Sequence, residues 1–191
     1  MRLFTAIELS EAVKAALVAA QEPLRRGNPP VKWVGPPEMH LTLQFLGETD
    51  PAQLPAITTA MRAALAGAGP FRLQLGALGA FPNTRRPGVL WVGVGGDLAA
   101  LERTQAAVVN ALEPLGFPRE QRPFRAHLTL GRVRRDAPPA DQARLGAVLA
   151  TLPAPPPLSW EADQVVLFQS ELLREGPRYT PLEEVRLEAS R

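Results

Sequence analysis

The stretches that decide the fold are His40-Leu41-Thr42-Leu43 and His127-Leu128-Thr129-Leu130, in which the same four residues occur twice. The chain of 191 residues contains two histidines in all, and each of them opens one copy. The copies stand nearly half a chain length apart. An identical continuation after both histidines is improbable by chance, and it indicates two structurally related halves.

Each copy has the alternation of a β-strand with one polar and one apolar side. Residues two apart in a strand face the same side, so each histidine points with its threonine while the leucines point the other way. Two such strands brought together line one polar cleft with two imidazoles and two hydroxyls. One imidazole can then accept a proton while the other donates one, as general acid–base catalysis requires. The hydroxyls are suitable donors for an anionic centre such as phosphate.

The cationic residues gather around the second copy. The chain carries 21 Lys and Arg against 19 Asp and Glu, a formal net charge of +2. Between positions 119 and 135 one acid stands among six arginines, which are Arg119, Arg122, Arg125, Arg132, Arg134 and Arg135. Arginine suits phosphate through its planar fork of donors, so this basic patch favours a polyanionic partner. A solvated cationic surface is the alternative interpretation.

Arg132 does not fit strict alternation. Counting from His127 places Thr129 and Gly131 in the cleft and Arg132 behind it. Arg132 reaches a ligand in the cleft only if Gly131 marks a bulge or a bend in the strand.

Composition excludes several classes of protein. The chain has no cysteine, which excludes a disulfide framework and a thiol nucleophile and fits a cytoplasmic protein. Two histidines without a carboxylate cluster leave a metal site short of ligands, so we expect no metal. Glu8 interrupts the first apolar stretch, and no run approaches the roughly 18 apolar residues of a membrane span. We therefore expect neither a signal peptide nor a transmembrane helix. The spacing in Gly93-Val94-Gly95-Gly96 is wrong for a nucleotide-binding loop.

Strand and helix signals are intermingled along the chain. Periodicity predicts strands over 3–9, 31–34, 40–47, 71–75, 89–94, 127–133 and 185–188, with a long strand or hairpin arm over 159–173. It predicts helices over 11–25, 50–66, 97–115 and 140–152. Ser10, Asp50 and Asp97 are suited to begin the first three helices. This mixture favours an α+β fold with antiparallel pairs over a parallel doubly wound sheet.

These residues resemble the two-histidine (2H) phosphoesterase superfamily. Within it, the chain is similar to the RNA 2′,3′-cyclic phosphodiesterases, which are also called 2′-5′ RNA ligases. The resemblance covers nearly the whole chain, and its segments are Phe4-Thr5-Ala6-Ile7, Trp33-Val34, 40–47, 124–132 and 167–172, with Gly176 and Tyr179. Ala126 stands where many members carry proline.

The resemblance implies an α+β fold of two pseudo-symmetric lobes. Each lobe would be an antiparallel sheet with helices packed outside, and the active-site cleft would lie between the lobes. Residues 1–191 would form a single bilobal domain with one His-x-Thr-x motif in each half. The implied reaction is hydrolysis of the terminal 2′,3′-cyclic phosphate of RNA to a 2′-phosphate, without metal or other cofactor. A reversible 2′-5′ RNA ligation could run in the same site.

The resemblance also implies a role for each site residue. His40 would be the proton donor to the departing 3′ oxygen, and His127 the proton acceptor that activates water. The implied substrate-binding residues are Thr42, Thr129, Phe4 and Arg132. Because the two motifs are nearly symmetric, the acid and the base could also be exchanged.

Two other functions compete with this interpretation. One is a cyclic phosphodiesterase that acts on small nucleotides, and the other is a non-catalytic RNA-binding module that uses the basic patch. Intact histidines and threonines in both motifs argue against the second. We expect RNA with a 2′,3′-cyclic phosphate end as the partner, no obligate protein partner, a monomeric state and a cytoplasmic location.

Overall fold

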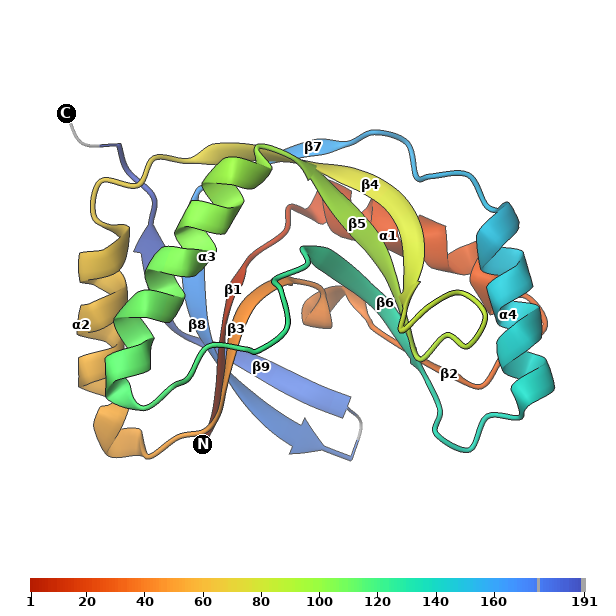
Figure 1. Cartoon of the computed structure of the whole chain (residues 1–191), viewed down its shortest axis with the longest axis horizontal. Helices are drawn as coiled ribbons and strands as arrows, with labels where there is room; N and C mark the ends of the chain where they lie inside the picture. The colour runs from red at the N-terminus through yellow and green to blue at the C-terminus, as the bar shows by residue number, and fades with distance from the viewer. Residues whose placement is uncertain (175, 190–191) are drawn as a thin grey trace.

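Two antiparallel sheets dominate the computed structural model, which describes residues 1–174 and 176–189 (Figure 1). The described residues form a four-stranded sheet in the order β3-β1-β8-β9 and a five-stranded sheet in the order β2-β6-β5-β4-β7. All the paired strands run antiparallel. The predicted α+β class with antiparallel pairing is therefore confirmed.

The first sheet consists of β3 (Leu41–Glu48), β1 (Arg2–Ile7), β8 (Gln164–Leu173) and β9 (Gly176–Arg186). The second consists of β2 (Val31–Trp33), β6 (His127–Val133), β5 (Val89–Gly96), β4 (Phe71–Phe81) and β7 (Ser159–Ala162). The helices are α1 (Glu11–Arg25), α2 (Leu54–Leu65), α3 (Leu98–Leu112) and α4 (Pro139–Thr151). Single 3₁₀ turns cover Pro36–Glu38, Pro51–Gln53 and Glu113–Leu115.

Helices pack against the outside of both sheets. The helices α2 and α3 pack together, and α2 contacts β9 while α3 contacts β3 of the first sheet (Figure 1). The helix α1 packs against α4 and contacts β6 of the second sheet. Two of the residues predicted to begin helices are confirmed as N-caps. Ser10 accepts a hydrogen bond from the Val13 amide, and Asp97 accepts one from the Ala100 amide. The helix predicted from Asp50 begins with the 3₁₀ turn before α2. Within the described part of the chain, no helix is both long and apolar enough to cross a membrane.

Each sheet draws its strands from both ends of the chain. The N-terminal β1 pairs with the C-terminal β8, and β2 from the first half pairs with β6 from the second. The stretch 159–173, predicted as a long strand or hairpin arm, is divided: β8 is an arm of the hairpin with β9, and β7 belongs to the other sheet. The chain leaves the second sheet after β7, passes through Asp163 and enters the first sheet in β8. Both segments are apolar and extended, so local pattern alone could not separate them.

One apolar core connects the two sheets. It includes fully buried residues of both, among them Leu3, Leu41, Leu90, Leu128 and Val165. A smaller apolar cluster stands apart from it and consists of Phe4, Ala6, Val166 and Phe168, with Tyr179 packed against them. This second cluster belongs to the first sheet and supports the functional site.

Candidate active site

A cleft of about 480 Å³ is lined by strands of both sheets. Five of the six predicted site residues line it, and they are His40, Thr42, Phe4, Thr129 and Arg132. The first three come from the first sheet or the residue preceding β3, and the last two come from β6. The sixth, His127, opens β6 two residues before Thr129 but does not itself belong to the cleft lining.

Both motif strands contain a bulge directly after the threonine. In β3, Thr42 pairs with Ala6 and Gln44 with Thr5, so Leu43 is an extra residue opposite β1. In β6, Thr129 pairs with Trp91 and Gly131 with Leu90, so Leu130 is the extra residue opposite β5. A bulge shifts the alternation of a strand by one residue.

The shift brings Arg132 back to the cleft. Along β6, Leu130 and Gly131 are both buried, and Arg132 is exposed and lines the cleft with Thr129. The sequence required a bulge or a bend at Gly131 for Arg132 to reach the cleft, and the structure has a bulge whose extra residue is the preceding Leu130. Along β3, the same shift buries Leu43 and Gln44 and leaves Phe45 on the cleft side.

A glutamine from a covering helix binds the bulged residue of each strand. Gln21 of α1 donates through Nε2 to the Leu130 carbonyl and the Val34 carbonyl, each at 2.8 Å. Gln105 of α3 donates through Nε2 to the Leu43 carbonyl at 3.4 Å. The Leu130 carbonyl also accepts from the Val34 amide at 3.0 Å, so Gln21 adds a second donor there. These bonds tie both bulges to the helices behind them.

His40 lies in an aromatic enclosure. Its ring centroid is 4.7 Å from Phe4, 6.3 Å from Phe168 and 5.2 Å from Tyr179, which meets it edge-on at 81°. Phe4 is only 2% exposed and stacks on Phe168 at 5.2 Å. Phe4, predicted to bind substrate, lines the cleft and packs against the histidine.

The enclosure lowers the pKa of His40 from 6.5 to about 4. Burial is the largest cause because it disfavours the charged ring, and the positive charge of Arg132 acts in the same direction. A hydrogen bond with the backbone of Glu38 opposes them. At neutral pH, His40 is therefore a neutral imidazole.

His127 is held in a defined tautomer. Its Nδ1 lies 2.7 Å from the carbonyl oxygen of Arg125. A carbonyl only accepts, so Nδ1 carries the proton in this hydrogen bond and the neutral ring keeps a lone pair on Nε2. Phe81 packs edge-on against the ring at 5.0 Å and 89°, and Trp91 lies at 6.4 Å. Both histidines thus interact with the backbone of the residue two positions earlier and with aromatic rings.

Tyr179, the one tyrosine of the chain, brings the C-terminal hairpin into the site. Its ring meets Phe4 edge-on at 5.0 Å and 75°, as well as His40. Burial and the neighbouring Glu38 raise the pKa of Tyr179, and Arg132 partly offsets them. The hydroxyl is therefore a neutral hydrogen-bond donor on the cleft wall.

The basic patch is only partly directed at the cleft. Arg132 is its one member in the lining, and no carboxylate of residues 1–174 and 176–189 forms an ion pair with it. Arg119 instead pairs with Glu113 at 3.1 Å and donates to Asn110 at 2.7 Å. Among the described residues, no group of three or more His, Cys, Asp or Glu side chains is placed to hold a metal ion.

Sequence reasoning missed Phe45, Arg2 and Glu38 as residues of the cleft. A signal for Phe45 was present. Extending the repeat by two residues aligns His40–Phe45 with the segment His127–Arg132, and so places Phe45 opposite the predicted Arg132. Arg2 and Glu38 carry no comparable pattern, because they reach the cleft only through strand pairing and a turn.

The fold and the paired motifs are those of the two-histidine phosphoesterases. The family model of the 2′-5′ RNA ligase superfamily matches residues 9–172. The chain is 32% identical over 187 residues to the RNA 2′,3′-cyclic phosphodiesterase of Methanothermobacter thermautotrophicus, covering 98% of this chain and 99% of that one. It is 36% identical over 193 residues to the enzyme of the same name from Thermus thermophilus, covering 98% and 90%. The chain belongs to the 2′-5′ RNA ligase superfamily.

Solved structures agree with this membership. TT0787 of Thermus thermophilus aligns over the whole of both chains with 35% identity and a TM-score of 0.77. E. coli LigT complexed with 3′-AMP aligns over 97% of both chains with 25% identity and a TM-score of 0.79. The two-sheet α+β architecture is therefore shared across the family members compared.

Proposed function

We propose that this chain is an enzyme that hydrolyses the terminal 2′,3′-cyclic phosphate of RNA to a 2′-phosphate. The observation that carries the proposal is the convergence of two bulged His-x-Thr strands, one from each sheet, on a cleft that Arg132 also lines. The activity printed for the relatives, RNA 2′,3′-cyclic phosphodiesterase, supports the same substrate.

His127 is the proposed base. With Nδ1–H donated to the Arg125 carbonyl, its free lone pair on Nε2 can take a proton from water. The water oxygen attacks phosphorus and forms a new P–O bond. The aromatic contacts of Phe81 and Trp91 limit the orientations of the imidazole, so the lone pair keeps one direction.

His40 is the proposed acid. The bond from phosphorus to the 3′ oxygen breaks, and His40 delivers a proton to that oxygen, which leaves a 3′-hydroxyl and a 2′-phosphate. The ligand-free pKa of about 4 means that the ring must gain its proton when substrate binds. The phosphodiester anion supplies the reason, since a negative charge beside the imidazole favours its protonated form and offsets Arg132.

The remaining groups hold the anion. The Thr42 and Thr129 hydroxyls lie on the cleft side of neighbouring motif strands and can donate to the nonbridging phosphate oxygens. The Arg132 guanidinium adds a fixed positive charge and a planar pair of donors. The step balances in atoms and protons without a further reactant. If the 5′-hydroxyl of a second RNA attacks in place of water, the same step joins the two RNAs through a 2′-5′ bond.

We further propose that one copy of the chain is the working unit and that it acts in the cytoplasm on RNA ends. Every side chain in the proposed reaction comes from one chain. A protein partner is not needed to complete the set of groups.

The neutral state of His40 favours the exchanged assignment, because a neutral imidazole can accept a proton. In that assignment His40 is the base and His127 is the acid. A substrate with sulfur in place of the 3′ bridging oxygen separates the two assignments, because a thiolate leaves without a proton. We expect His40→Ala to lose at least about 100-fold in kcat/KM on the oxygen substrate and to recover most of it on the sulfur substrate. His127→Ala should stay impaired on both.

The opposite rescue pattern would establish the exchanged roles. Chromatography of the product from the wild-type protein should show the phosphate on the 2′ oxygen. If both alanine variants retain wild-type rates, the proposed function is wrong.

A further inference from the structure

Phe45 is a large aromatic side chain that the proposed reaction does not use and that the fold leaves uncovered. It is 59% exposed, and Leu172 in β8 is 70% exposed. Both line the cleft. The inner aromatic residues of the same sheet, Phe4 and Phe168, are only 2% and 7% exposed. Phe45 and Leu172 are therefore exposed apolar residues at the mouth of the cleft, whereas the aromatic residues packed against His40 are buried.

The position of Phe45 follows from the repeated architecture. The bulge after Thr42 returns Phe45 to the cleft just as the bulge after Thr129 returns Arg132. The ring centroid of Phe45 lies 6.1 Å from that of Phe4 at 43°, so it continues the aromatic wall outward from His40. At equivalent positions, β6 thus presents the cation of Arg132 to the cleft and β3 presents the aromatic ring of Phe45.

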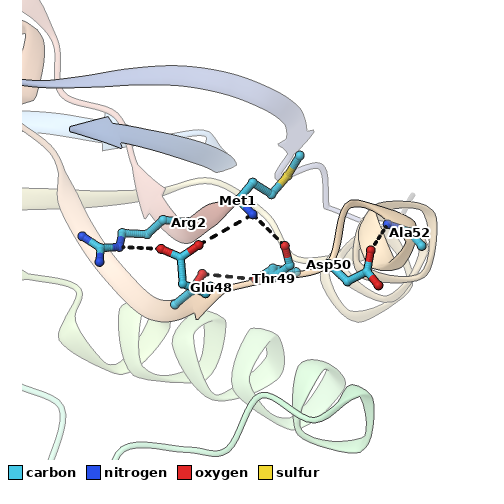
Figure 2. A network of polar contacts seen from close by, with 7 residues as sticks. Met1, Arg2, Glu48, Thr49, Asp50 and Ala52 are labelled. Atoms are coloured by element: carbon cyan, nitrogen blue, oxygen red, sulfur yellow. Dashed lines mark hydrogen bonds and ion pairs between the residues drawn. The ribbon is translucent and has the colours of Figure 1, made fainter. Parts of the chain in front are cut away.

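Arg2 places a positive charge at the same mouth. Its Nε lies 3.4 Å from Glu48, and the α-amino group of Met1 lies 3.7 Å from the same carboxylate and donates to the Thr49 carbonyl at 2.8 Å. Figure 2 shows this network, in which the two terminal nitrogens of the Arg2 guanidinium point away from Glu48. Arg2 lines the cleft two residues before Phe4, the β1 partner of Phe45, so those nitrogens can bind an anion at the mouth.

We propose that Phe45, Leu172 and Arg2 form a subsite for the nucleotide that precedes the cyclic-phosphate end of an RNA. The base of that nucleotide stacks on Phe45, Arg2 binds the phosphate that joins the last two nucleotides, and Leu172 adds apolar surface further along the same mouth. The inference rests on the proposed function. The terminal phosphate binds beside His40, which packs against the buried Phe4, so the exposed mouth is where the rest of the RNA leaves the site.

The subsite makes the enzyme selective for RNA ends over cyclic mononucleotides. A mononucleotide can fill the reacting groups but has neither a second base for Phe45 nor a second phosphate for Arg2. Stacking of a base on an aromatic side chain contributes to binding whatever the base, so the selectivity concerns length and not sequence.

The test compares a 2′,3′-cyclic mononucleotide with a dinucleotide that carries the same cyclic end. We expect Phe45→Ala to lower kcat/KM on the dinucleotide roughly tenfold more than on the mononucleotide. Phe45→Trp should restore the dinucleotide preference, since it keeps an aromatic surface. Val148→Ala is the matched control, because Val148 is 36% exposed on α4 and lies outside the cleft lining.

Arg2→Gln tests the phosphate contact separately. It should lower kcat/KM on the dinucleotide and reduce the slope of log kcat/KM against log salt by about one. Equal losses on both substrates in Phe45→Ala, or no loss on either, would overturn the subsite while leaving the proposed function intact. A wild-type protein that opens neither substrate would overturn the proposed function and the subsite together.

Discussion

At the scale of single residues, surroundings decide what each histidine can do. His40 and His127 begin identical tetrapeptides, yet His40 is enclosed by Phe4, Phe168 and Tyr179 and has a pKa of about 4. The ring of His127 is oriented by the Arg125 carbonyl. The repeat therefore supplies two equal imidazoles, and the packing around them makes them unequal.

The lowered pKa of His40 predicts a specific dependence of stability on pH. The unfolded chain binds a proton on this residue below pH 6.5, whereas the folded chain binds it only near pH 4. The contribution to stability is complete above pH 6.5 and is lost as the pH falls toward 4, for a total of about 3 kcal/mol. Urea unfolding between pH 7 and pH 4 should show a steeper loss in wild type than in His40→Asn. Parallel profiles would contradict the prediction.

At the scale of elements, two bulged strands and the helices behind them set the geometry of the site. Without the extra Leu43 and Leu130, alternation would turn Phe45 and Arg132 away from the cleft. The side chains of Gln105 and Gln21 then bind the carbonyls of those bulged leucines. The helices on the outside of each sheet thus fix the residues on its inner side.

Gly131 is the point at which this geometry is most sensitive. A Cβ there would lie 2.6 Å from Val31 Cγ1 and 3.0 Å from Trp33 Cε3, so β2 would have to move away from β6. We expect Gly131→Ala to cost roughly 1–3 kcal/mol of unfolding free energy and to lower kcat/KM, since Arg132 follows directly.

Gly95→Ala is the matched control, because its Cβ would meet its nearest neighbour, the Gln74 carbonyl oxygen, at an ordinary 3.9 Å. Urea unfolding and activity of the two variants check the prediction. Equal unfolding midpoints for Gly131→Ala and Gly95→Ala would show that the β2–β6 contact tolerates the added methyl.

At the scale of the whole molecule, the two sheets cannot form independently. The first sheet needs β8 and β9 from the C-terminal end, and the second needs β2 from the N-terminal part. One continuous apolar core joins them. The cleft is lined by strands of two sheets that share both chain and core, which supports the prediction of a single domain.

This arrangement predicts one cooperative unfolding transition. The three tryptophans, Trp33, Trp91 and Trp160, all lie in the second sheet, so their fluorescence reports that sheet. Far-ultraviolet circular dichroism reports both sheets and the helices. The two signals should give the same midpoint and slope in urea, as two-state unfolding requires. A further change in circular dichroism after the fluorescence transition is complete would show that the sheets unfold separately.

The sequence by itself determined the features that depend on neighbours along the chain. The repeated tetrapeptide predicted the two motif strands and the sides of their residues, because alternation is a local property of a strand. Ser10 and Asp97 predicted where α1 and α3 begin, because an N-cap side chain bonds amides only a few residues away. The roles of His40 and His127 remain proposals drawn from that pattern and from the family.

Only the tertiary structure decided the features that depend on distant pairing. The bulges are defined by pairing with a partner strand. Residues 159–173 divide between two sheets because their two parts pair with different strands. Packing across the first sheet decides that Phe4 is buried against His40 while Phe45 stays exposed at the mouth. Both are phenylalanines near a motif residue, and nothing local distinguishes them. Burial is set by residues far away in the chain, and so the path of a substrate could be inferred only from the fold.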